Sequence, residues 1–222
     1  MAEASQQPPL RHRVPAVELG VEIPPEPPDI GARQLYLAAR MMAGATVFFF
    51  LAFAFAYFYL RSLNQQHMWR PKGVGPEQGF GVAIVVVLVI SALLAYDSKR
   101  LMARTLRRWM TAAAASLVLG LAAVALQCIE YATQNFGPAS GAYASVYCGW
   151  TAFYTLLMLG TLYWIETHVA TELRARRAPA PAAQGDIANP DWLILPGLDA
   201  AVFFWTFVVG LGVLTWVILY LV

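Results

Sequence analysis

The residue with the clearest chemical potential in this chain is a carboxylate, Glu130. It closes an apolar stretch that runs from Thr111 to Tyr131. A charged side chain at the centre of a membrane helix costs roughly 2.5–3.5 kcal/mol or more, so such a residue usually has a partner or a function. Two interpretations stay open. Either the carboxylate reaches interfacial water from a helix end, or it is a buried acid that is hydrogen-bonded to Gln127, Tyr131 or a hydroxyl such as Ser145.

Histidines are the next residues to consider, because histidine is the usual protein ligand of haem and copper. The chain has three, His12, His67 and His168, and none is placed to pair with another across a helix bundle. Glu166 and His168 form an E-x-H pair, which we interpret as the polar end of a helix. No P-loop, GxSxG or HExxH motif is present. We therefore expect this chain to have no catalytic residues and to bind no metal or cofactor itself, apart from phospholipid.

Composition indicates the class of protein. Hydrophobic residues make up 59% of the 222 residues, charged residues make up 13%, and the mean hydropathy is +0.55. Soluble domains carry about 45–50% apolar and about 25% charged residues. The chain is therefore expected to be an integral membrane protein. Its basic residues are spread among the loops, which argues against a nucleic-acid partner.

Five apolar stretches are long enough to cross a bilayer, which takes about 20 residues. Their approximate bounds are 35–60, 79–96, 111–131, 145–170 and 198–222. The second is rich in β-branched residues, but a single strand cannot satisfy its backbone in lipid, which favours a helix. We predict an all-α, five-helix transmembrane domain over residues 35–222. The Pro-rich residues 1–34 are predicted to form an extended or disordered tail.

The distribution of Lys and Arg predicts the orientation. Most of them lie in the tail and in the second and fourth loops, whereas the other side holds Arg61, Arg70 and Lys72. By the positive-inside rule, the N-terminus is cytoplasmic and Val222 is outside. Glu130 would then lie near the outer face. Four tryptophans close to the span ends are expected to form aromatic belts: Trp69, Trp109, Trp150 and Trp192.

Other side chains have narrower expected roles. Arg61 either extends its apolar stem so that the guanidinium reaches the membrane interface, or pairs with a phosphate headgroup. Trp205 lies too deep for a belt, so it either packs at a helix or subunit interface or contacts a lipid tail. Asp199 is expected to be the N-cap of the fifth helix. Small and hydroxyl residues at regular spacing around Thr151 indicate a helix that packs against protein rather than lipid.

Four blocks together resemble one family. They are Ala56-Tyr57-x-x-Leu60-Arg61, Leu126-Gln127-x-x-Glu130-Tyr131, Gly141-x-Tyr143-x-Ser145-x-Tyr147-x-x-x-Thr151-x-Phe153, and Gly197-x-Asp199-Ala200-x-x-x-x-Trp205-x-Phe207-Val208. They resemble motifs of subunit III of the haem–copper terminal oxidases, the cytochrome c and quinol oxidases, in its five-helix form. No single block is specific, but the four follow one another in family order over most of residues 35–222.

The departures from the family pattern concern polar groups. Two family histidines align with Tyr154 and Leu157, and a further histidine and an aspartate are replaced within residues 205–209. The acidic residue usual in the first helix falls near Thr46, and Glu77 is the only counterpart of a second one. Roles that the family assigns to those side chains, such as support of proton uptake, are therefore not carried over to this divergent chain.

The resemblance implies a non-catalytic subunit of a respiratory oxidase in the bacterial cytoplasmic (inner) membrane. Haem and copper would belong to the catalytic subunit I, to which this chain attaches, with subunit II as a further partner. The family role is to stabilise the catalytic subunit, with bound lipid. The alternatives are the related accessory subunit of nitric oxide reductase and a free-standing small transporter or assembly factor.

Overall fold

The computed structural model describes residues 28–64, 69–102, 106–177 and 191–222. Within these ranges the fold is all-α, as predicted: the helices are joined by short loops and turns, and there is no strand. The long helices are α1 (Pro28–Ser62), α2 (Gln78–Met102), α3 (Leu106–Thr133), α4 (Ala142–Arg177) and α5 (Asp191–Trp216). A short 3-10 helix, η2 (Pro138–Ser140), precedes α4, and a π-helical turn, η3 (Val217–Leu221), follows α5.

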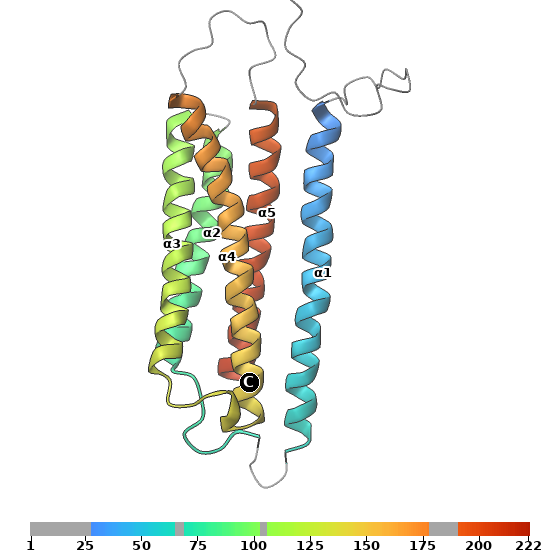
Figure 1. Ribbon diagram of the computed structural model, residues 1–222, viewed down its shortest axis with the longest axis vertical. Coiled ribbons are helices and arrows are strands. Elements are labelled where there is room, and N and C mark those ends of the chain that lie inside the picture. The colour runs from blue at the N-terminus through green and yellow to red at the C-terminus, as the bar shows by residue number, and fades with distance from the viewer. Residues whose placement is uncertain (1–27, 65–68, 103–105, 178–190) are drawn as a thin grey trace, which may run out of the picture.

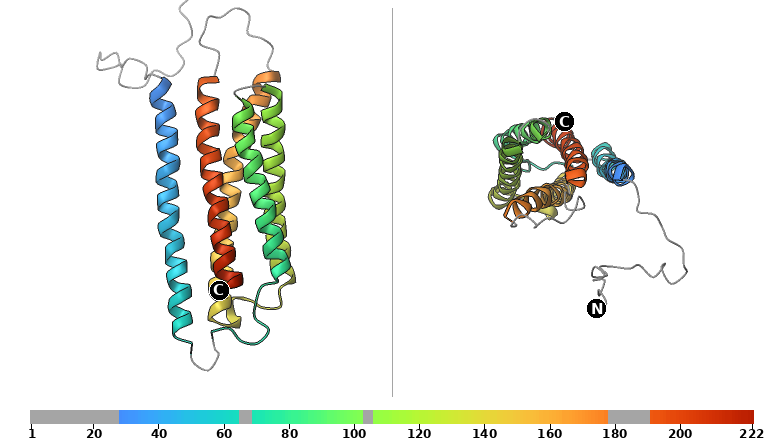
Figure 2. Two further views of the ribbon diagram at one scale, coloured as in Figure 1. Left: turned by 180° about the vertical axis from the view of Figure 1, so that it is seen from behind. Right: turned by 90° about the horizontal axis from the view of Figure 1, so that it is seen from above.

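The helices run alternately up and down along one axis (Figure 1). Seen along that axis, α2 to α5 form a ring, and α1 stands outside the ring beside α5 (Figure 2). The contacts of α1 are with α5 and α4, whereas α2 packs most extensively against α3. Because the number of long helices is odd, Pro28 and Val222 lie at opposite ends of the bundle. Which end faces the cytoplasm stays a prediction from the basic residues.

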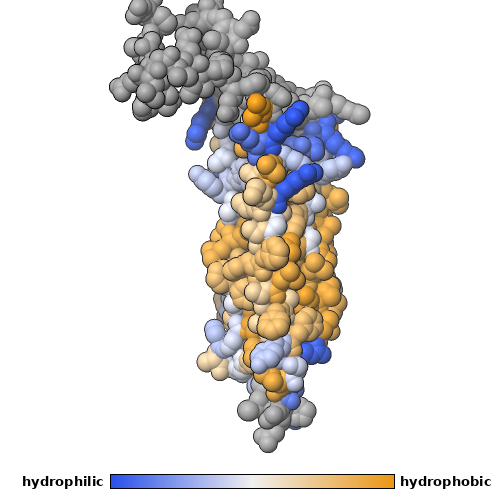
Figure 3. Space-filling model, turned by 90° about the vertical axis from the view of Figure 1, so that its right-hand side faces the viewer, coloured by the Kyte–Doolittle hydropathy of each residue, from blue (hydrophilic) through white to orange (hydrophobic). Residues whose placement is uncertain are grey.

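Four of the helices are long and apolar enough to cross a membrane, over Arg33–Ser62, Gln78–Leu101, Arg108–Thr133 and Pro196–Leu221. The remaining helix, α4, has 36 residues and lies alongside the other four. It is more polar because its ring-facing side carries threonines and tyrosines that hydrogen-bond inside the bundle. We therefore count α4 as the fifth membrane helix. Apolar side chains cover the middle of the displayed face, and hydrophilic side chains gather toward the end of the bundle where α1 begins (Figure 3).

Several helices are longer than the sequence predicted. Helix α1 begins at Pro28 rather than at Leu35. Proline is favoured in the first turn of a helix, where its missing N–H would have no partner in any case. The rest of the predicted tail, residues 1–27, lies outside the described residues. Helix α5 begins at Asp191 and contains Pro196, so the prediction that Asp199 caps this helix is wrong.

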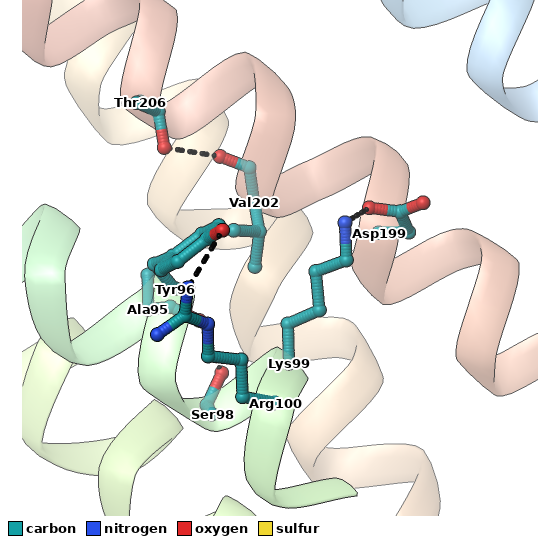
Figure 4. Close-up of polar contacts among 8 residues, drawn as sticks. All are labelled: Ala95, Tyr96, Ser98, Lys99, Arg100, Asp199, Val202 and Thr206. Carbon is teal, nitrogen blue, oxygen red and sulfur yellow. Dashed lines mark hydrogen bonds and ion pairs between the residues drawn. The ribbon is translucent and has the colours of Figure 1, made fainter. Parts of the chain in front are cut away.

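Asp199 instead joins two helices. Its carboxylate forms an ion pair with Lys99 of α2, near the end of the bundle where α5 begins (Figure 4). The next residue, Arg100, lies over the ring of Tyr96, one turn earlier on α2. Its guanidinium is 4.4 Å from the centre of that ring and donates a hydrogen bond to the tyrosine hydroxyl. Both side chains of the ion pair are partly exposed, so the pair contributes at most about 1 kcal/mol.

The tryptophans near the helix ends correct a second prediction. Trp69, Trp109 and Trp150 are buried inside the bundle rather than exposed to the membrane interface. Trp69 packs edge-on against Tyr57 and Tyr143, which closes one end of the bundle. The side chain of Trp192 lies outside the described ones. These three aromatic rings are therefore part of the core.

Candidate functional site

Glu130 points into the ring of helices and is only 2% exposed. The hydroxyl of Tyr220 donates to both carboxylate oxygens, at 2.8 Å to Oε1 and 2.9 Å to Oε2. The side-chain amide of Gln127, one turn earlier on α3, donates to Oε2 at 3.0 Å. Of the two interpretations of Glu130, the structure supports the buried, hydrogen-bonded acid. Gln127 is one of the partners that the sequence suggested, whereas Tyr220 was not.

Tyr220 is held in place by three other helices. Its hydroxyl lies 3.0 Å from the hydroxyl of Tyr147 on α4. The carbonyl of Tyr220 accepts a hydrogen bond from Gln78 of α2, and the carbonyl of Leu219 accepts one from Tyr143 of α4, each at 2.6 Å. Carbonyl groups at a helix end have no partner within the helix. These two side chains therefore satisfy them and fix the turn that carries Tyr220.

The other hydroxyl residues that the sequence singled out, Tyr131, Ser145 and Thr151, have hydrogen-bond partners other than Glu130. Tyr131 donates to the hydroxyl of Thr151, and Thr151 donates to the carbonyl of Tyr147 at 2.6 Å. Ser145 donates to the carbonyl of Pro138 and ties the start of α4 to the preceding turn. Tyr131 and Thr151 thus join α3 to α4. Ser145 does not reach Glu130.

Trp205 lies in the middle of the ring and exposes none of its surface. Its indole N–H donates to the hydroxyl of Ser91 on α2 at 3.1 Å. Ser91 and Ser116 of α3 donate to each other's carbonyls at 2.7 and 2.8 Å. A side chain at Gly120 would place its Cβ 3.2 Å from the Trp205 ring. Trp205 is thus a packing residue that joins α2, α3 and α5 inside this chain, and its buried ring leaves no surface for a lipid tail.

Arg61 lies in the last turn of α1 and is exposed. This position suits both expected roles, a stem that lies along the helix and a guanidinium that binds a phosphate headgroup. Both stay predictions. In the described ranges, no group of three or more His, Cys, Asp or Glu side chains is arranged so that it could hold a metal ion.

Comparison with known proteins identifies the family. The family model described as cytochrome c oxidase subunit III matches residues 32–174, which is more than half of the chain. The chain belongs to the cytochrome c oxidase subunit III family. The match covers α2, α3 and most of α1 and α4, including Arg61, Gln127 and Glu130. It ends before α5, so Trp205 and Tyr220 lie beyond it.

Two curated relatives are named cytochrome c oxidase subunit 3. The platypus protein (Ornithorhynchus anatinus) is 27% identical over 134 residues, which are 57% of this chain and 51% of the relative. The echidna protein (Tachyglossus aculeatus aculeatus) is 27% identical over 126 residues, which are 54% and 48% of the two chains. This chain therefore spans about half the length of these two relatives. Its glutamate network joins a helix inside the matched segment to one outside it.

Proposed function

We propose that this chain is the non-catalytic subunit III of a haem–copper respiratory oxidase in the bacterial cytoplasmic membrane. It would pack against the catalytic subunit I, with subunit II as a further neighbour, and haem and copper would be bound by those partners. The observation that carries the proposal is the family match over α1 to α4. The fold is consistent with this role, since the polar side chains of the ring bind one another and tie the helices together.

The surface of α1 that faces away from the ring is apolar. Large apolar side chains project from α1 away from the ring, with Met41 68%, Phe48 76% and Phe55 70% exposed. Such a surface is stable only against lipid tails or against apolar helices of another subunit. Helix α1 packs against the ring mainly through α5 and α4, so its opposite side is available to the catalytic subunit.

Apolar grooves on the two sides of α1 support lipid binding. One, of about 450 Å³, is lined by residues of α1 and α4 that include Phe49 and Phe153. The other, of about 200 Å³, lies between α1 and α5 and includes Leu51 and Leu214. Both grooves are lined mainly by apolar side chains, which suits the acyl chain of a lipid. A phospholipid tail in each groove would fill the space beside α1 and join it to the ring.

The stabilising role is tested with the complete oxidase, purified with and without this chain from matched strains. We expect the oxidase that lacks the chain to reduce oxygen at a normal initial rate and then to lose activity faster during turnover. Equal rates of inactivation would show that the chain does not stabilise the catalytic subunit. Copurification with a nitric oxide reductase instead of an oxygen-reducing oxidase would contradict the assignment itself.

A further inference from the structure

A polar cavity lies against Glu130 at the end of the bundle where α3 ends and α2 begins. It has a volume of about 100 Å³. Its walls include three side chains of the α3 end, Glu130, Thr133 and Gln134, and Glu77, which directly precedes α2. Most of the lining surface is polar. Glu130, although buried within the protein, therefore forms part of the wall of a polar chamber.

The size and chemistry of this cavity suit water. A water molecule needs roughly 10–15 Å³ of such volume and two to four polar partners, so the chamber accommodates several. The side-chain oxygen Oε1 of Gln134 is buried there without a hydrogen-bond partner among the described residues. Buried polar atoms are usually hydrogen-bonded to protein or to ordered water.

A second, smaller cavity lies on the inner side of the same network. It has a volume of about 20 Å³, which is room for one water molecule, and it is lined in part by Gln127, Thr151 and Tyr220. The indole N–H of Trp216, another lining residue, is buried without a partner in the described structure. The hydrogen-bonded group of Gln127, Glu130 and Tyr220 therefore separates the polar outer chamber from a small inner cavity whose lining is mostly apolar.

The groups that face Glu130 leave its charge without a cation. They are Tyr220 after α5, Tyr147 of α4, Gln127 of α3 and the carboxylate of Glu77. The guanidinium of Arg70, in the same region, lies 4.7 Å from the centre of the Tyr143 ring, and its Nε donates to the carbonyl of Val74. No ion pair to Glu130 occurs in the described part of the chain. Hydrogen-bond donors and neighbouring water must therefore stabilise its charge.

We propose that Glu130 is a proton-binding site that exchanges with the water at this end of the bundle through the polar cavity. A hydronium ion in the cavity transfers a proton to the Glu130 carboxylate, which leaves a neutral acid and a water molecule, and release is the reverse step. If the positive-inside orientation is correct, this water is on the outer side of the membrane.

The hydrogen-bond network accommodates both protonation states without movement of a helix. The ionised carboxylate accepts bonds from Tyr220 and Gln127. The neutral acid must donate one bond, and it can donate to cavity water or to the oxygen of Tyr220, whose own proton then turns toward Tyr147. Hydroxyl groups rotate to suit either arrangement. Tyr147 and Tyr220 are thus positioning residues for the proton.

Infrared difference spectroscopy on the protein in its native complex in membranes tests the proposal. Spectra are recorded while the buffer is switched between mildly acidic and mildly alkaline pH, and then from H₂O to D₂O. The contribution of Glu130 is the band that is lost in Glu130→Gln and shifted in Tyr220→Phe, which keeps the carboxyl but removes a donor. We expect this band to respond to pH and to shift in D₂O within seconds. A Glu130 band that is unchanged by pH and by short exposure to D₂O would overturn the proposal.

A matched pair of variants tests the route. Thr133→Phe places a ring at the wall of the cavity, whereas Ala132→Phe places the same ring on the neighbouring exposed position, which does not line it. We expect Thr133→Phe to slow the exchange of the Glu130 band at least tenfold and Ala132→Phe to leave it unchanged. Fast exchange in both variants would show that protons do not reach Glu130 through this cavity.

Discussion

Removal of one hydroxyl, in Tyr220→Phe, tests whether the Glu130 network holds the helices together. The change deletes the donor to both oxygens of Glu130 and the contact with Tyr147, while the aromatic ring keeps its packing. A hydrogen bond to a charged group contributes about 1.5–3 kcal/mol. Bonds between membrane helices contribute less, about 0.6 kcal/mol on average and about 1.7 at most. Because Glu130 would lose the donor to both of its oxygens, we expect a loss of about 2 kcal/mol, near the upper end of the range for membrane helices and within the range for a charged group.

Thermal unfolding in mild detergent, followed by circular dichroism, measures this loss. For a chain of this size, 1 kcal/mol corresponds to about 2–4 °C, so the midpoint should fall by about 4–8 °C. Tyr163→Phe is the matched control, since Tyr163 is 69% exposed on the outer face of α4, and its midpoint should not change. Glu130→Gln should stay within about 1 kcal/mol of wild type, because the amide still accepts from Tyr220. Equal midpoints for Tyr220→Phe and Tyr163→Phe would refute the reasoning.

Three further substitutions test the packing of the ring by the same assay. A Cβ at Gly81 would lie 2.5 Å from the Tyr220 ring, so Gly81→Ala should lower the free energy of unfolding by about 1–3 kcal/mol. The control is Gly44→Ala, where a Cβ would have no atom within 4 Å and should cost nothing. A Gly81→Ala protein as stable as wild type would argue against this close approach. Ser91→Ala leaves the buried N–H of Trp205 without its acceptor and should cost about 1–3 kcal/mol, and a loss below 0.5 would show that the serine contact is unimportant. Lys99→Met removes a partly exposed ion pair and should cost less than about 1 kcal/mol, so a larger loss would contradict the screening argument.

The sequence predicted the all-helical fold and offered a buried, hydrogen-bonded Glu130 as one of two interpretations, for physical reasons that act locally. A long apolar stretch in lipid must be helical to satisfy its backbone, and Gln127 lies one turn from Glu130 on the same helix face. Tyr220 could not be found in this way, because it lies 90 residues along the chain from Glu130 and reaches it through a π-helical turn. A tyrosine near the end of the last apolar stretch gave only a weak indication of this contact.

The errors at the helix ends have a common origin. Both the core and the lipid are apolar, so hydrophobicity does not tell which side of a membrane helix faces inward. Trp69 and Trp150 were therefore expected at the membrane interface, although they are buried in the bundle. The fifth span was predicted to begin at Leu198, the start of the continuous apolar stretch, yet α5 begins at Asp191 and continues through Pro196. Asp199 then faces Lys99 in mid-helix instead of capping an N-terminus.

Copurification tests the proposed function most directly. An affinity-tagged chain is isolated from native membranes in mild detergent, separated by native electrophoresis and examined by a reduced-minus-oxidised haem spectrum with an oxygen-consumption assay. We expect the tagged chain to migrate with haem in a fixed ratio and with oxygen-reducing activity. A chain that migrates without haem, or with haem but without oxygen reduction, would contradict its assignment as subunit III of a terminal oxidase.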